Sequence, residues 1–144
     1  MRQAQITILG YGGLIPFFGC VALAYGSEQS DFWIYSLHIY GVIIASFLGA
    51  ISWGLAISSK SMLPVQRDFL VYWGVMPAIL GWICMLIPQS VRLIPLLILF
   101  LLTLGVDIYI CKKHSLPKFW LELRVCLTCG VILALLLAAF STQR

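Results

Sequence analysis

Five apolar stretches, each close to the length that crosses a lipid bilayer, account for most of this 144-residue chain. About 20 helical residues span the ~30 Å hydrocarbon layer, because each residue adds about 1.5 Å. The stretches are continuously apolar and lack the alternation of a membrane β-barrel strand. We therefore predict an all-α fold, a single domain over residues 1–144 that forms an integral membrane bundle of five transmembrane helices. The predicted helices cover residues 7–25, 35–57, 69–87, 93–111 and 121–140.

The composition excludes a water-soluble fold of this size. Hydrophobic residues make up 62% of the chain and charged residues 10%, and the mean hydropathy is +1.03. Soluble domains carry roughly 25% charged residues, so lipid must cover much of this chain's outer surface. The net charge of +4 comes from basic residues in short loops beside the predicted helices. Membrane lipid is therefore an expected partner, and nucleic acid is not.

The charged residues fall unevenly on the two sides of the predicted bundle. If the chain crosses five times, one side receives Arg2, Lys60, Arg67, Lys112, Lys113, Lys118 and Arg124. The other side receives Arg92 and Arg144, and its first loop contains Glu28 and Asp31. Because basic residues favour the cytoplasmic side, we expect the N-terminus in the cytoplasm and the C-terminus outside.

The first apolar stretch also has features of a signal peptide, since Arg2 precedes it and small residues follow it. Its apolar run is longer than the usual ~7–15 residues, and another spanning helix comes next, so we favour a retained helix. No Arg- and Ser-rich transit segment precedes it, which favours the bacterial cytoplasmic (inner) membrane as the location.

Small residues recur every four positions on the second predicted helix. One row is Gly41, Ala45 and Gly49, and a second row is Ser46, Ala50 and Gly54. Such rows let neighbouring helix backbones approach closely, and a general enrichment of Gly and Ala explains one row more easily than two. We therefore expect this helix to pack closely on two sides. The fourth predicted helix, rich in Leu and Ile, is expected at the periphery.

The pattern Tyr-x-Gly-x-x-Pro occurs twice, ending at Pro16 in the first predicted helix and at Pro77 in the third. Both helices would run in the same direction, so the pattern favours a duplicated helical hairpin followed by a fifth helix, a type of repeat known in transporters. A chance match explains the pattern equally well. In either case each proline removes a backbone hydrogen bond, and we expect kinks at Pro16 and Pro77.

Asp107 and Arg124 are charged residues predicted within the membrane, about one turn inside the facing ends of the fourth and fifth helices. They are almost equidistant from the middle of the connecting loop, so an antiparallel hairpin places them at one depth. Because an unpaired charge is costly there, we expect an ion pair. We favour a structural clasp, with a site for an anionic group or a proton path as the alternative. The candidate polar cluster also includes Trp53, Tyr11, Tyr72 and Thr128.

The residues give little support to metal, haem or catalytic chemistry. The histidines, His38 and His114, are predicted near opposite sides of the membrane. Cys126 and Cys129 form a C-x-x-C inside a predicted helix without a second pair, whereas structural zinc takes four ligands. No H-E-x-x-H, P-loop or G-x-S-x-G pattern occurs. We expect no cofactor and no metal, and an enzyme is the least favoured class of function.

Several segments resemble a known family. They are residues 9–17 (LGYGGLIPF) and 46–54 (SFLGAISWG), Pro77, Asp107, and Leu123-Arg124 ahead of Leu127-Thr128. Together they are similar to the domain-of-unknown-function family of small multi-pass membrane proteins that includes mitochondrial transmembrane protein 69. The resemblance covers nearly the whole chain and implies a small multi-pass inner-membrane protein, without implying an activity. Relatives have a larger polar or basic residue where Ser52 stands, which disfavours a charged site on that helix.

Two functions from different classes remain. The favoured one is a structural or accessory protein that packs in the membrane against other membrane-protein subunits or against itself, because so few groups are available for catalysis. The alternative is a carrier or receptor that binds a small lipophilic or anionic ligand in a cytoplasmic-side cavity near Trp53, Asp107 and Arg124.

Overall fold

The computed structural model describes residues 2–59, 62–114 and 117–141, and within these ranges each regular element is an α-helix. The helices are α1 (Arg2–Gly12), α2 (Ile15–Gly26), α3 (Ser30–Ser58), α4 (Pro64–Leu86), α5 (Leu93–His114) and α6 (Lys118–Ser141). Lys60 and Arg144, and the side chains of Arg2 and His114, lie outside this description.

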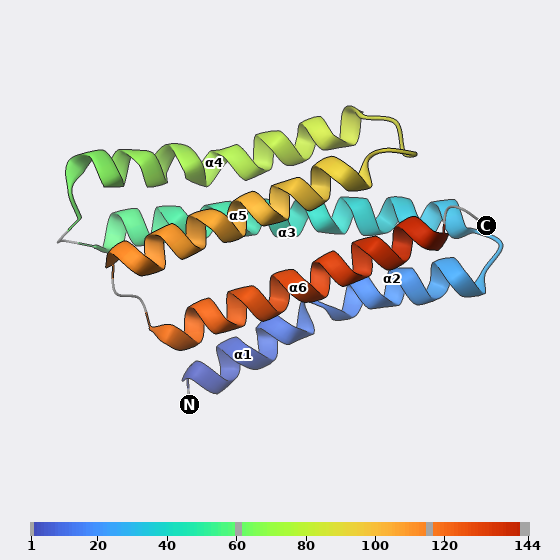
Figure 1. Ribbon diagram of the computed structural model, residues 1–144, viewed down its shortest axis with the longest axis horizontal. Coiled ribbons are helices and arrows are strands. Elements are labelled where there is room, and N and C mark those ends of the chain that lie inside the picture. Colours follow the sequence, from blue (N-terminus) through green and yellow to red (C-terminus); the bar gives the residue numbers. More distant parts are fainter. Residues whose placement is uncertain (1, 60–61, 115–116, 142–144) are drawn as a thin grey trace.

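The helices confirm the predicted all-α fold. Among the described residues, five segments are long and apolar enough to cross a membrane: Gln3–Gly26, Ser30–Ser58, Pro64–Leu86, Leu93–Lys113 and Lys118–Ser141. Most begin before the predicted apolar runs, because their first turns carry polar residues such as Asp31 and Gln66. Successive spans run in opposite directions, and the two termini lie at opposite ends of the bundle (Figure 1).

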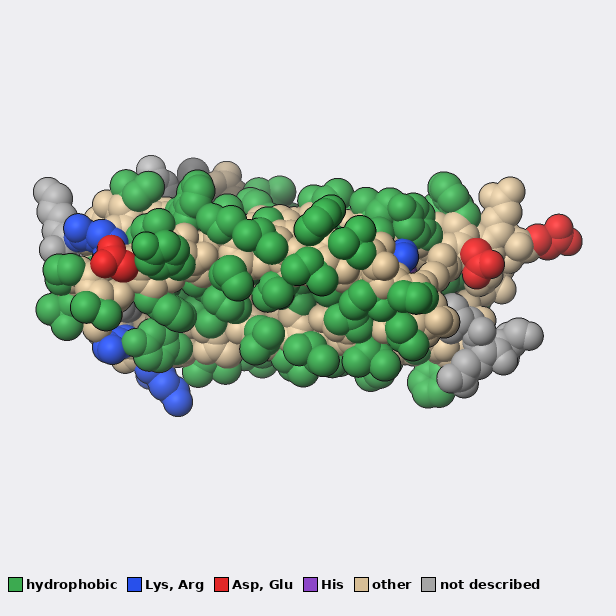
Figure 2. Space-filling model, turned by 90° about the horizontal axis from the view of Figure 1, so that it is seen from above, with side chains coloured by type: hydrophobic (Ala, Val, Ile, Leu, Met, Phe, Trp, Pro, Cys, Tyr) green, Lys and Arg blue, Asp and Glu red, His purple; other side chains and the backbone are tan. Residues whose placement is uncertain are grey.

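The outer surface is that of a membrane protein. Apolar side chains cover the middle of the visible face, and charged side chains gather at its two ends (Figure 2). Large apolar side chains that would be buried in a soluble fold are exposed here, among them Ile57, Val65 and Trp82. Lipid is the solvent that such a surface requires.

Helix α3 is central, as expected from its small residues, and it contacts α2, α4 and α5. The row Gly41, Ala45 and Gly49 is buried. A Cβ on Gly49 would lie 2.6 Å from the Gly74 carbonyl oxygen, and one on Gly41 would lie 2.9 Å from a methyl group of Leu96. This row therefore brings the backbone of α3 against α4 and against the side chains of α5.

Two of the three residues in the second small-residue row of α3 face outward. Ser46 is half-buried and donates its hydroxyl to the Val42 carbonyl oxygen of the same helix at 2.9 Å. Ala50 and Gly54 are exposed, and a Cβ on Gly54 would meet nothing within 4 Å. Ala50 and Gly54 therefore leave this part of α3 on the surface of the described structure, in contrast to the expectation that both rows pack closely along their length.

The prediction that the fourth span is peripheral is wrong. Helix α5 contacts α3, α4 and α6. Leu96, Leu99, Phe100 and Ile110 on this helix are at most 2% exposed. A run of Leu and Ile has no row of small residues, but its branched side chains fill the space between neighbouring helices.

The two prolines have different effects on their helices. The first span breaks at Gly13 and Leu14, and Pro16 lies in the first turn of α2, where a missing N–H is tolerated. The Tyr40 hydroxyl donates to the Gly13 carbonyl oxygen at 3.0 Å, a part-buried hydrogen bond that ties α3 to the break. Helix α4 continues through Pro77 without interruption. The proposed duplication stays a prediction, since the two motifs differ in local structure.

Candidate functional site

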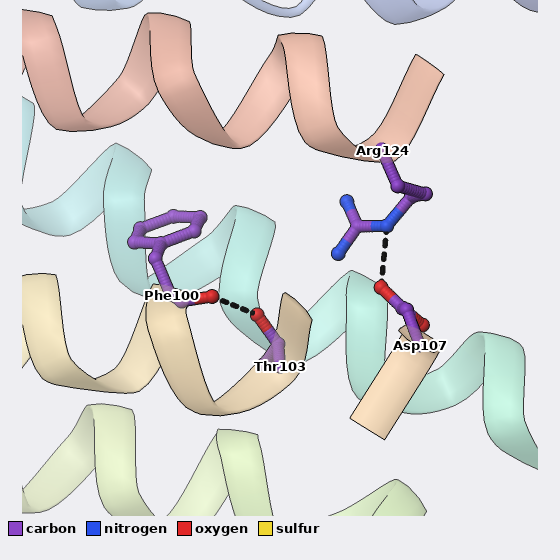
Figure 3. A network of polar contacts seen from close by, with 4 residues as sticks. All are labelled: Phe100, Thr103, Asp107 and Arg124. Atoms are coloured by element: carbon purple, nitrogen blue, oxygen red, sulfur yellow. Dashed lines mark hydrogen bonds and ion pairs between the residues drawn. The ribbon is translucent and has the colours of Figure 1, made fainter. Parts of the chain in front are cut away.

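The ion pair expected from the sequence joins α5 to α6. Arg124 Nε donates to Asp107 Oδ2 at 2.6 Å, and the side chains of Arg124 and Asp107 are 4% and 15% exposed (Figure 3). The two residues meet because the α5–α6 connection is short and each lies about two turns inside its helix end. The positive and negative charges therefore compensate one another away from water.

The pair leaves part of Arg124 without a partner. A guanidinium carries five N–H donors, and Arg124 Nη2 is buried with no hydrogen-bond partner among the described residues. One turn further along α6, Thr128 is 1% exposed and its hydroxyl oxygen is also unpartnered there. Buried polar groups normally find a partner. Two such groups on one face of one helix indicate a place where something else supplies the hydrogen bonds.

Arg124 and Thr128 line a partly open space of about 130 Å³ between α1, α2, α3, α5 and α6, here called the inner cavity. Figure 3 shows the terminal nitrogens of Arg124 on the side of the Phe100 ring, and Phe100 lines the same cavity. The other walls are apolar or glycine: Leu9, Gly10, Gly13, Leu14, Phe17, Ile44, Phe47, Leu48, Leu127 and Val131.

A larger space of about 410 Å³ adjoins the inner cavity and is called the outer groove. The two share the lining residues Leu9, Gly10, Phe47, Leu48, Arg124 and Leu127. The outer groove continues between α1, α3 and α6 past Ile6, Ile51, Trp120 and Leu123. Leu9 and Phe47 on its walls are 77% and 63% exposed. The groove therefore opens on the surface that lipid covers.

The break in the first span helps to form this space. Gly10 and Gly13 line the inner cavity with no side chain of their own. A Cβ on Gly10 would lie 3.2 Å from a methyl group of Leu127, which also lines the cavity. Larger residues at these two positions would fill part of the room beside Arg124.

The predicted polar cluster divides into two parts. Asp107, Arg124 and Thr128 lie together, whereas Trp53, Tyr11 and Tyr72 line neither the inner cavity nor the outer groove. Tyr11 and Tyr72 are 47% and 75% exposed. Trp53 Nε1 donates to the Val71 carbonyl oxygen at 2.7 Å, and its ring lies directly against Gly74. Trp53 therefore joins α3 to α4 on another side of the bundle.

A second set of buried polar residues lies toward the opposite end, and sequence reasoning did not include it. His38 is 0% exposed, and neither of its ring nitrogens has a partner in the described chain. Arg92 is 9% exposed; its Nε donates to the Ile87 carbonyl oxygen at 2.9 Å, and its guanidinium carbon lies 5.6 Å from the centre of the Tyr35 ring. Spacing could have identified His38, because it is three residues before Gly41 on the buried side of α3.

The remaining candidates for metal chemistry do not come together. Among the residues whose placement is described, no three His, Cys, Asp or Glu side chains lie close enough to hold a metal ion. Cys126 and Cys129 are free thiols exposed on the outside of α6. The chemistry available at the inner cavity is therefore hydrogen bonding and apolar contact.

A family model described as "Protein of unknown function (DUF3429)" matches residues 2–140, which include every residue of the cavity and groove. The chain belongs to this family. It is also 28% identical over 133 residues to Transmembrane protein 69 of Xenopus tropicalis, an alignment that covers 88% of this chain and 50% of the relative. The chain thus spans about half the length of that curated relative. No solved structure matches the chain.

Membership confirms the resemblance noted in the sequence and agrees with a multi-pass membrane protein. The family description names no activity.

Proposed function

We propose that this DUF3429 protein is a carrier or receptor that binds an amphiphilic molecule, with its polar head in the inner cavity and its apolar chain in the outer groove. The observation that carries the proposal is the pair of unpartnered polar atoms, Arg124 Nη2 and Thr128 Oγ1, on residues that line an otherwise apolar space. A buried donor without an acceptor costs free energy. A ligand that accepts these hydrogen bonds recovers that cost.

The shape of the site supports an elongated ligand. The inner cavity, about 130 Å³, holds a small head group, and the adjoining groove of about 410 Å³ holds a flexible chain. The exposed side chains of Leu9 and Phe47 beside the groove face the lipid. A ligand would therefore enter sideways from the hydrocarbon layer without crossing water.

The charge distribution supports one orientation for the protein. Arg67, Lys112, Lys113 and Lys118 belong to the end of the bundle that holds the α3–α4 and α5–α6 connections, here called the basic end (Figure 1). Asp107 and Arg124 lie in the half of the membrane nearer to this end. With the basic end in the cytoplasm, the site faces the cytoplasmic side of a bacterial inner membrane.

Photo-crosslinking tests this proposal. The probe is methyl dodecanoate with a diazirine on its acyl chain. It is added to the full chain in maltoside detergent, and the sample is irradiated. The labelled residues are then mapped by mass spectrometry. We expect labels on the α1 and α6 residues of the outer groove. Leu127→Trp places an indole where cavity and groove meet and should reduce this labelling about tenfold or more, the equivalent of ~1.4 kcal/mol.

Leu133→Trp is the matched control, because Leu133 lies on the same helix and is 51% exposed to lipid. Labelling of the groove should be unchanged in this variant. Equal labelling in Leu127→Trp and wild type, or labels spread evenly over the lipid-facing surface, would contradict the proposal.

A second candidate function is an accessory protein, and the exposed small residues of α3 favour it. Ala50 and Gly54 are exposed in the described structure and leave the backbone of α3 open to a further helix. If the chain works in this way, a stoichiometric membrane-protein partner or a second copy should co-purify in mild detergent. Gly54→Leu should then release that partner without unfolding the bundle.

A further inference from the structure

The charges around the inner cavity identify the kind of head group that fits, if the amphiphile site just proposed exists. Arg124 is the charged residue that lines the inner cavity and the outer groove. Its charge is already compensated by Asp107, which contacts Nε from α5 and does not line either space. The site as a whole therefore carries no net charge.

We infer that the ligand has a neutral, hydrogen-bond-accepting head, such as the carbonyl of an ester or ketone. The two groups that need partners set this requirement. Arg124 Nη2 can only donate, and the Thr128 hydroxyl can donate as well. A carbonyl oxygen has two lone pairs and can accept from both donors at once.

An anionic head is disfavoured by the same geometry. A carboxylate would bring a second negative charge to Arg124, and the two anions with one cation would leave one charge uncompensated in an apolar space. Burying an uncompensated charge costs far more than burying a hydrogen-bonded neutral group. The carboxylate would also have to leave the water-lined interface, where its charge is hydrated.

A matched pair of competitors tests the inference. Methyl dodecanoate and dodecanoate have the same chain and differ in the charge of the head at pH 7.5. Each is used to displace the diazirine-carrying ester from the full chain in maltoside detergent. The measured quantity is the ratio of the two concentrations that halve groove labelling. Comparing this ratio between variants cancels the different partition of the two compounds into micelles.

Asp107→Asn is the deciding variant, because it keeps an acceptor for Arg124 Nε and gives the site a net positive charge. Dodecanoate should then compete better relative to the ester than it does in the wild type. The ratio should change in favour of dodecanoate by about tenfold or more, which corresponds to ~1.4 kcal/mol. Asp68→Asn removes an exposed carboxylate at the same end of the bundle and should leave the ratio unchanged. An unchanged ratio in Asp107→Asn would overturn the neutral head and leave the amphiphile site intact.

The double variant Asp107→Asn with Arg124→Gln covers the case in which Asp107→Asn does not fold. It removes both charges together, keeps an amide donor at position 124, and leaves the site neutral. The ester should still displace the probe, and the ratio should stay as in the wild type. Loss of competition by dodecanoate alone would show that Arg124 binds an anion. Failure of both competitors, with equal labelling in Leu127→Trp and wild type, would overturn the proposed function as well.

Discussion

At the scale of single residues, the Asp107–Arg124 pair places two opposite charges inside the bundle. Each side chain is largely buried, and the 2.6 Å contact between Nε and Oδ2 compensates two charges that would otherwise be exposed to an apolar medium. Such a pair adds little to stability compared with apolar residues of similar volume, but breaking it from one side is costly. The loss of stability on removing the pair should therefore depend strongly on whether one or both partners are changed.

Arg124→Met should destabilise the protein by about 3–5 kcal/mol, because Asp107 is left buried and unpaired. Asp107→Leu combined with Arg124→Met should recover most of this loss, since no charge then remains inside. The measurement is the midpoint of thermal unfolding in detergent, followed by circular dichroism. A double variant as unstable as the single one would show that the pair is not simply a clasp between α5 and α6.

Replacing His38 should have the opposite effect on stability. Its ring is fully buried, and both nitrogens lack partners among the described residues. His38→Leu removes an unsatisfied polar group that costs about 1–3 kcal/mol, so the variant should be as stable as wild type or more so. Thr103→Val is the control, because the Thr103 hydroxyl does donate, to the Phe100 carbonyl oxygen at 2.8 Å. A larger loss of stability in His38→Leu than in Thr103→Val would mean that something bonds to the imidazole.

At the scale of helices, the two small-residue rows of α3 behave differently although their spacing is the same. Gly49 faces the α4 backbone, and Gly54 faces outward. The four-residue spacing shows that each set of small residues lies along one side of the helix, since each residue turns the helix by about 100°. The sequence contains no signal for which row turns toward a neighbour.

This difference predicts contrasting effects of the same substitution. Gly49→Ala should destabilise by about 1–3 kcal/mol, because its methyl group would lie 2.6 Å from the Gly74 carbonyl oxygen. Gly54→Ala meets nothing within 4 Å and should stabilise α3 by up to ~1 kcal/mol, the helix-propensity difference. Unfolding by sodium dodecyl sulfate, monitored by circular dichroism, measures both. Equal effects of the two substitutions would contradict the assigned faces of α3.

The helical spans and the ion pair could be predicted from sequence because both depend on distance along the chain. Length and hydropathy located the spans, and equal distance from the loop located Asp107 opposite Arg124. The inner cavity could not be predicted in this way. Trp53 and Tyr72 lie at a suitable depth but on other sides of the bundle, whereas Phe100 and Val131 line the cavity without any polar signal. The kinks expected at the two prolines could not be predicted reliably either. Pro16 follows two glycines at the break in the first span, whereas Pro77 packs against Gly49 in a continuous helix.

At the scale of the whole molecule, an odd number of spans places the two termini at opposite ends, and the charges distinguish those ends. Arg67, Lys112, Lys113 and Lys118 lie around the connections at the basic end, and Glu28 and Asp31 lie at the other end. The same asymmetry bears on the site, since the inner cavity lies nearer the basic end. Orientation therefore decides from which leaflet an amphiphile reaches the outer groove.

Reporter fusions in a bacterial host test this orientation. With the basic end in the cytoplasm, alkaline phosphatase fused after Arg144 should be active, and a fluorescent protein fused at the same place should be dark. Fused ahead of Met1, or inserted in the α3–α4 connection, the reporters should give the reverse pattern. Replacing Lys112, Lys113 and Lys118 together by Gln should weaken the preference, because these residues supply much of the charge difference. Both termini in one compartment would contradict the five-span fold, whereas a full inversion would retain the fold and move the amphiphile site to the outer leaflet.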